Sequence, residues 1–255
     1  MSRKSEDNRP LFLVSNDDGY RARGVHELTR MLSRIGHVVA VCPEDAQSGM
    51  SMAITVKRPL RLRPISDYAD SEPDVEWYAV DGTPVDCVKL AMYTVVRERR
   101  PDMVCSGINH GSNSAINVVY SGTMGAAFEG TACGIPAVGF SLCDHSADAD
   151  FGPMMPFVEA TVMKVLSEGL PEGVCLNLNA PKVTDIVGLR YCRSARGHWT
   201  DEYAEMQPPY GLPVYWLTGR FISEEPDAED TDEWALSHGY ISIVPELLDR
   251  TAPDI

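Results

Sequence analysis

Two adjacent carboxylates, Asp17 and Asp18, are the residues whose types and spacing most directly suggest chemistry. They follow an unbroken apolar run and are flanked by Asn16 and Gly19. Two neighbouring negative charges repel each other, and a hard divalent cation held by oxygen ligands would offset that repulsion. Asn, Asp and Gly also dominate ordinary turns, so these four residues alone are equally compatible with a turn and with a metal site.

Two later loops carry further polar groups. The first, residues 43–51, contains Gln47, Ser48 and Gly49. The second, residues 106–123, is rich in asparagine and glycine and follows a short apolar run. Long loops inside compact domains are usually functional or disordered, and this composition after a buried strand favours function.

The second loop ends in Ser121, Gly122 and Thr123, which lead into the small-residue segment 124–132. We expect this segment to be a helix, whose first N–H groups have no partner inside the helix and could hold a phosphate oxygen. An ordinary N-cap explains the serine and threonine equally well. The sequence therefore offers a candidate phosphate site here without requiring one.

The elements that must position these groups alternate between strand and helix as far as about residue 181. Apolar runs without polar alternation predict strands buried on both faces, and apolar residues at helical spacing predict crossover helices. The fold class is thus α/β, with a Rossmann-like, mostly parallel sheet and helices on both faces. The expected strands are 11–15, 37–42, 77–80, 102–106, 135–141 and 174–178, and the expected helices are 25–35, 85–99, 124–132 and 157–166.

Three local features complete this outline. Gly36 is expected to cap the first helix at its C-terminus. Apolar and basic residues alternate within 53–65, which predicts a half-exposed strand or hairpin. Beyond residue 190 the aromatic residues lack a periodic core. We therefore expect residues 1–190 to form the core and residues 191–255 to be an extension of the same domain.

Composition excludes several classes of function. The 255 residues carry a net charge of −15, which argues against coating of nucleic acid or binding to anionic membranes. The first ten residues are polar, and no later run approaches the roughly 18 apolar residues of a membrane span. Seven scattered cysteines without a Cys-x-x-Cys pair suggest reduced core thiols. We expect a cytoplasmic protein.

The three polar loops follow three different strands at one edge of the predicted sheet. Together they offer carboxylate, hydroxyl and amide oxygens, which suit Mg²⁺, Mn²⁺ or Ca²⁺ better than zinc. Next to a helix start that holds phosphate, such a cation could bridge a phosphoryl oxygen and an attacking water.

Four motifs, in this order and spacing, make the chain resemble the SurE (survival protein E) family of metal-dependent nucleotidases. They are Ser-Asn-Asp-Asp-Gly, Gln-Ser-Gly, Ser-Gly-Ile-Asn-His-Gly-Ser-Asn and Tyr-Ser-Gly-Thr-Met-Gly-Ala-Ala-Phe-Glu-Gly. The chain also resembles later signatures of the family at 177–181 and 239–245, so the resemblance extends over nearly the whole chain. Departures from the family pattern fall on none of the implied ligands; they are Ala115, Asn117, Ala180 and Val244.

The resemblance implies a 5'-nucleotidase that hydrolyses nucleoside 5'- and 3'-monophosphates with one divalent cation, Mg²⁺ or Mn²⁺, and with Ca²⁺ possible in crystals. The implied metal ligands are Asp17, Asp18, Ser48 and Asn109. The residues implied to contact phosphate or the attacking water are Asn16, Asn113, Ser121, Gly122 and Thr123, with Asp17, Asn16 and Asn113 as the catalytic group. His110 lies in the right loop to protonate the leaving group, although a loop histidine more often only forms hydrogen bonds.

The resemblance also implies a homodimer or homotetramer that exchanges its C-terminal segments. Two alternatives to the nucleotidase remain: a broad-specificity phosphatase or exopolyphosphatase, and a non-catalytic nucleotide-binding regulator. The intact Asp-Asp-Ser-Asn set disfavours the regulator, because binding alone does not require a water-activating cation. A dinucleotide oxidoreductase is disfavoured because no Gly-x-Gly-x-x-Gly follows the first strand.

Overall fold

The central strand β1 (Leu11–Ser15) shows how the sheet is built. In the computed structural model, which describes residues 8–69 and 71–252, β1 sends Phe12 and Val14 into the hydrophobic core on one face. It sends Leu11 and Leu13 into the core on the other face. This alternation explains the unbroken apolar run, because both faces of the strand are covered. The polar residues 1–7 lie outside the described part.

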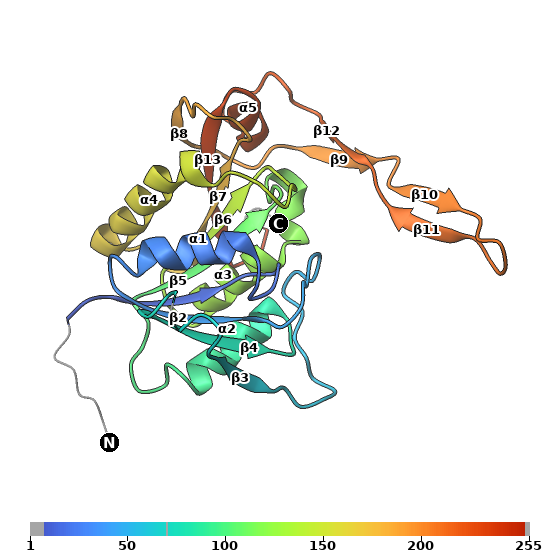
Figure 1. Ribbon diagram of the computed structural model, residues 1–255. Coiled ribbons are helices and arrows are strands. Elements are labelled where there is room, and N and C mark those ends of the chain that lie inside the picture. Colours follow the sequence, from blue (N-terminus) through green and yellow to red (C-terminus); the bar gives the residue numbers. More distant parts are fainter. Residues whose placement is uncertain (1–7, 70, 253–255) are drawn as a thin grey trace.

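The main sheet has nine strands in the order β3-β4-β2-β1-β5-β6-β7-β13-β8 (Figure 1). The strands from β4 to β7 are parallel, whereas β3 and β13 pair with their neighbours β4 and β7 in antiparallel fashion. The expected Rossmann-like sheet is confirmed. The strand bounds are β2 His37–Pro43, β3 Leu62–Ile65, β4 Val75–Val80, β5 Met103–His110, β6 Ala137–Leu142, β7 Val174–Ala180, β8 Gly188–Tyr191 and β13 Tyr240–Leu247.

Helices cover both faces of this sheet. Helices α1 (Arg23–Leu32) and α4 (Met155–Glu168) pack into one core, and α2 (Pro84–Tyr93) and α3 (Gly122–Ala132) pack into the other. Two short 3₁₀ helices are η1 (Ala115–Val119) and η2 (Gly152–Met154).

The predicted role of Gly36 is wrong. Helix α1 ends at Leu32, four residues earlier, and Gly36 does not have a positive φ. A Cβ at Gly36 would lie 2.2 Å from the carbonyl oxygen of Pro10. The glycine is therefore needed because the backbone before β1 passes close to it.

Two other elements are shorter than predicted. Helix α2 ends at Tyr93, and only Leu62–Ile65 of the alternating segment forms a strand.

The C-terminal region forms a long arm and then returns to the sheet. Strands β9 (Gly197–Thr200) and β12 (Arg220–Ser223) pair at the arm's root, and β10 (Tyr203–Met206) and β11 (Val214–Leu217) pair farther out. Figure 1 shows this arm extending away from the sheet. After α5 (Asp232–Ser237), β13 inserts between β7 and β8.

The order of the strands creates a switch point beside β1. The chain moves from β1 toward β2 and β4 on one side, and from β5 toward β6 and β7 on the other. In such sheets the loops at the carboxyl ends of the two central strands diverge and leave a crevice for ligands.

Within the described residues, no helix is long and apolar enough to cross a membrane. All seven cysteines are free thiols.

Candidate active site

The acidic pair lies in a tight turn at the carboxyl end of β1. Asn16 is fully buried, and its side-chain amide donates to the carbonyl oxygen of Gly19, 2.9 Å away. Gly19 has a φ of +89°, a conformation that a larger residue would adopt only under strain. Asn16 thus closes the turn that holds Asp17 and Asp18, and it does so from below the surface.

Hydrogen bonds hold both carboxylates, of which Asp17 is buried and Asp18 half-buried. Asp17 is 3% exposed, and its Oδ1 accepts from the hydroxyl of Thr123 at 2.5 Å. Burial raises the pKa of Asp17 to about 6, with hydrogen bonds from Thr123 opposing the rise and repulsion from Asp18 adding to it. Burial also raises the pKa of Asp18, opposed by the backbone N–H of His110, which donates to its Oδ2 at 3.1 Å. The negative charge of the pair is therefore disfavoured unless a cation compensates it.

The loop after β2 is tied to the loops that follow β1 and β5. The backbone N–H of Gln47 donates to the carbonyl oxygen of Asp17 at 2.6 Å. The hydroxyl of Ser51 donates to the carbonyl oxygen of Val119 in η1 at 2.7 Å. Ser48 lies between these two anchors, exposed at the pocket wall.

The amides of Asn109 and Asn113 have orientations fixed by their nitrogen atoms. Asn109 Nδ2 donates to the carbonyl oxygen of Gly111, and Asn113 Nδ2 donates to Ser141 Oγ, both at 2.8 Å. Each side chain has a single oxygen, which therefore points away from the partner of the nitrogen and remains an acceptor. No described residue donates to either oxygen. Asn113 is fixed further by its backbone N–H, which donates to Asn179 Oδ1 at 2.8 Å.

The N-terminus of α3 lies directly against Asp17. A Cβ on Gly122 would lie 2.8 Å from Asp17 Cβ, so only glycine permits this approach. Ser121 is the N-cap, and its hydroxyl accepts from the N–H of Met124 at 3.0 Å. Thr123 is fully buried and directs its hydroxyl toward Asp17. Thr123 thus supports the carboxylate through its hydroxyl and its backbone N–H. The N–H groups of Met124 and Gly125 bond to Ser121, which leaves the hydroxyl hydrogen of Ser121 and the N–H of Gly122 as donors for a ligand.

A pocket of about 900 Å³ opens at this edge of the sheet. Five of the candidate residues line it: Asp17, Ser48, Asn109, Asn113 and Ser121. Four others are adjacent in sequence to these lining residues but do not line the pocket themselves: Asn16, Asp18, Gly122 and Thr123. The structure therefore brings the three predicted loops together around one cavity.

The pocket also contains residues that the sequence reasoning did not assign to a site. His145, in the loop after β6, and three aromatic residues, Tyr120, Trp199 and Tyr203, line it. His110, the candidate for protonating the leaving group, lines it too, and its Nδ1 donates to the carbonyl oxygen of Ser146 at 3.1 Å. His145 could have been recognised from the sequence, because it follows an expected strand as the other site residues do. Trp199 and Tyr203 could not, because they reach the pocket only through contacts between distant segments.

The donor set fits a hard cation. In residues 8–69 and 71–252, no three His, Cys, Asp or Glu side chains gather as a metal-binding group. The candidate set instead combines two carboxylates with hydroxyl and amide oxygens, ligands typical of Mg²⁺, Mn²⁺ and Ca²⁺. The carboxylate pair with raised pKa values and the Asn109 oxygen, which the bond from its nitrogen to Gly111 leaves as an acceptor, both suit such an ion.

Fold and pocket together define the class of the protein: a Rossmann-like α/β protein with its ligand pocket at the switch point of the sheet. Residues 12–201 match the model of the family described as "Survival protein SurE". The chain belongs to the SurE family, as its motifs predicted.

Individual relatives agree with this assignment. "5'-nucleotidase SurE" of Phocaeicola vulgatus is 47% identical over 96% of this chain and 93% of its own length. "5'-nucleotidase SurE" of Flavobacterium johnsoniae is 48% identical over 97% and 94%. The crystal structure of the SurE protein from Aquifex aeolicus superposes with a TM-score of 0.79 at 37% identity, covering 95% of each chain.

Proposed function

We propose that this protein is a phosphoric monoester hydrolase that converts nucleoside 5'-monophosphates, and 3'-monophosphates, to nucleoside and phosphate. One observation carries the proposal: a single pocket joins an oxygen-rich end around Asp17 to an aromatic wall formed by Tyr120 and Trp199. A phosphate needs only the first part, whereas a nucleoside would occupy the second. The names of the relatives from Phocaeicola and Flavobacterium support the same activity.

Four residues would hold one divalent cation, Mg²⁺ or Mn²⁺: Asp17, Asp18, Ser48 and Asn109. Such a cation supplies Lewis-acid activation of water and neutralises charge on the phosphoryl group. Asp17 and Asp18 provide the negative charge that binds it, and Thr123 orients Asp17 through its hydroxyl. Asn109 contributes its amide oxygen, because its nitrogen is engaged with Gly111.

The remaining residues act on the phosphate and the water. Ser121 and Gly122 lie at the N-terminus of α3, where the Ser121 hydroxyl and the Gly122 N–H can donate to phosphate oxygens without adding a basic side chain. Asn113 directs its oxygen away from Ser141, so this oxygen can accept a hydrogen bond from the attacking water and orient it. Asn16 contributes by closing the turn under Asp17.

Phosphate release from a panel of substrates tests the proposal. The panel contains nucleoside 5'- and 3'-monophosphates, an aryl phosphate and pyrophosphate, each with Mn²⁺ and with excess EDTA. We expect nucleotides to have the highest kcat/KM and turnover to stop in EDTA. Equal turnover of the aryl phosphate would instead indicate a broad-specificity phosphatase, the second candidate, which the large open pocket also allows.

We also propose that residues 191–255 form an oligomerisation extension exchanged between subunits of a homodimer or homotetramer. The outer arm supports this, because Tyr210, Tyr215, Trp216 and Leu217 are 93%, 60%, 63% and 72% exposed. Exposed apolar surface of this kind usually marks an interface. The seven free thiols support a reducing, cytoplasmic location.

A further inference from the structure

The pocket has two chemically different ends. Asp17 and Ser48 belong to a polar part of its lining, and another part of the lining comes from η1 and the root of the arm. This second part forms a wall that contains Asn117 from η1 and Trp199 from β9, together with other apolar and aromatic side chains. A volume of about 900 Å³ is near the upper end of the range for small-molecule sites, and it greatly exceeds the needs of a phosphate.

Asn117 is fixed in this wall by a hydrogen bond from Trp199. The indole Nε1 of Trp199 lies 2.8 Å from Asn117 Oδ1. An indole N–H can only donate, and an asparagine side chain has one acceptor, so the oxygen must face Trp199. The amide nitrogen then points to the other side with two hydrogens, and no described residue accepts either of them. Asn117 is half-buried and lines the pocket.

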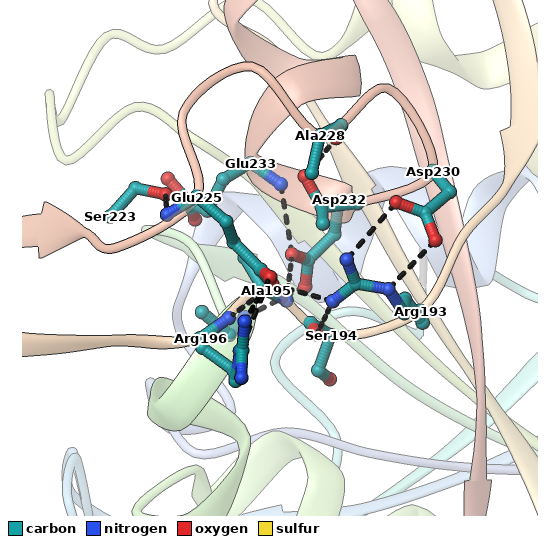
Figure 2. Close-up of polar contacts among 12 residues, drawn as sticks. Arg193, Ser194, Ala195, Arg196, Ser223, Glu225, Ala228, Asp230, Asp232 and Glu233 are labelled. Carbon is teal, nitrogen blue, oxygen red and sulfur yellow. Dashed lines mark hydrogen bonds and ion pairs between the residues drawn. The ribbon is translucent and has the colours of Figure 1, made fainter.

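A single side chain, that of Asp232, holds the backbone near both members of this pair. Asp232 is fully buried; its Oδ2 accepts from the N–H of Ala115, where η1 begins, at 2.7 Å. Its Oδ1 accepts from the N–H of Ala195, just before β9, at 2.8 Å. Figure 2 shows Asp232 beside the ion pairs of the arm's root, where Arg193 bridges Glu225 and Asp230. The geometry of the Asn117–Trp199 pair is therefore set before a ligand enters.

We infer that Asn117 is a specificity-determining residue that donates its amide hydrogens to an acceptor atom of the nucleobase. The base lies against the aromatic wall of Trp199 and Tyr120 while the phosphate occupies the Asp17 end. This inference rests on the proposed function, because it assigns the nucleoside half of that site. A pre-oriented donor adds selectivity, since a substrate without the matching acceptor leaves the amide unpaired.

The test compares a nucleoside 5'-monophosphate with ribose 5-phosphate, which lacks only the base, in the Mn²⁺-loaded enzyme. Asn117→Asp preserves the shape and the acceptor for Trp199 but replaces the donor with a second acceptor. We expect kcat/KM for the nucleotide to fall about tenfold or more, and kcat/KM for ribose 5-phosphate to change less than about twofold. Inhibition by the free nucleoside should weaken by the same factor, while inhibition by inorganic phosphate should be unchanged.

Two further variants sharpen the result. Trp199→Phe retains an aromatic surface but releases the amide, so the nucleotide alone should lose kcat/KM, by less than in Asn117→Asp. Asp201→Asn is the control: this exposed arm residue pairs with Arg220 at 3.9 Å and does not line the pocket, so both substrates should be unaffected.

Equal losses on both substrates in Asn117→Asp, or no loss on either, would overturn the inference. Wild-type enzyme that hydrolyses no nucleotide would instead overturn the proposed function itself. The two failures are distinguishable because the first appears only in the variant and the second already in the wild type.

Discussion

Replacing Asp17 by asparagine should stabilise the metal-free protein while it abolishes catalysis. Asp17 has a pKa of about 6 in place of its ordinary 3.8, mainly because it is buried. This difference corresponds to about 3 kcal/mol by which the ionised carboxylate is disfavoured in the fold at pH 7. Asparagine carries no charge and can still accept from the hydroxyl of Thr123. In EDTA, we expect Asp17→Asn to raise the free energy of unfolding by up to about 3 kcal/mol.

The pH dependence of the wild type has a defined sign. Between pH 3.8 and about 6 the folded protein binds a proton at Asp17 that the unfolded chain does not. The contribution of Asp17 to stability therefore rises as the pH falls from 7 through 6, and levels off below 3.8. The difference between wild type and Asp17→Asn in EDTA should shrink over the same range.

Urea denaturation followed by circular dichroism, in EDTA and in Mn²⁺, measures these effects. Mn²⁺ should stabilise the wild type, because a ligand that binds only the folded state adds to its stability, and Asp17→Asn should lose this gain. Asp86→Asn is the matched control. Although Asp86 is buried, hydrogen bonds from Thr55 and Thr83 lower its pKa, so its loss should destabilise the protein and leave the Mn²⁺ effect intact. An Asp17→Asn protein that is less stable than wild type in EDTA at pH 7, or equally stabilised by Mn²⁺, would refute the reasoning.

Three further predictions concern the neighbouring residues and the arm. Ser121→Ala should weaken phosphate binding by about 1–2 kcal/mol, and calorimetric titration should show unchanged Mn²⁺ affinity, whereas a selective loss of Mn²⁺ would assign Ser121 to the cation. Thr123→Val should weaken Mn²⁺ binding in the same titration, because Asp17 loses its hydroxyl donor; an unchanged Mn²⁺ affinity would contradict its supporting role. Light scattering should find at least a dimer. The double variant Trp216→Ser, Leu217→Ser in the exposed arm should shift the oligomeric state toward monomer. A stable, active wild-type monomer would reject the exchange of C-terminal segments between subunits.

Local patterns predicted the part of the fold that surrounds the site. The run Leu11–Val14 is apolar at every position because alternate side chains enter two different cores. This property reveals a parallel sheet, and a parallel sheet places the ends of its strands at one edge. Asp17, Ser48 and Asn113 could therefore be assigned to one pocket from sequence order alone.

Contacts between distant segments were not predictable in this way. Thr123 meets Asp17 across 106 positions, and the Asn117–Trp199 bond spans 82. Such pairs leave no local pattern in the sequence. Each partner, taken alone, also fits an ordinary role as a helix cap or a surface residue. The extension beyond residue 190 was expected, but the strands of its arm were not, for a different reason. Residues of both faces of β10 and β11 remain exposed, so no alternation of apolar and polar residues marks these strands in the sequence.

In the proposed mechanism, a cation held by Asp17 and its neighbours activates water against the phosphate of a nucleotide. Phosphate release from nucleoside 5'-monophosphate tests it most directly, measured for wild type and Asp17→Asn with Mn²⁺ and with excess EDTA. We expect rapid release only for wild type with the cation, and its return when Mg²⁺ or Mn²⁺ is restored after chelation. Full turnover by wild type in excess EDTA, or wild-type kcat in Asp17→Asn at limiting Mn²⁺, would contradict it.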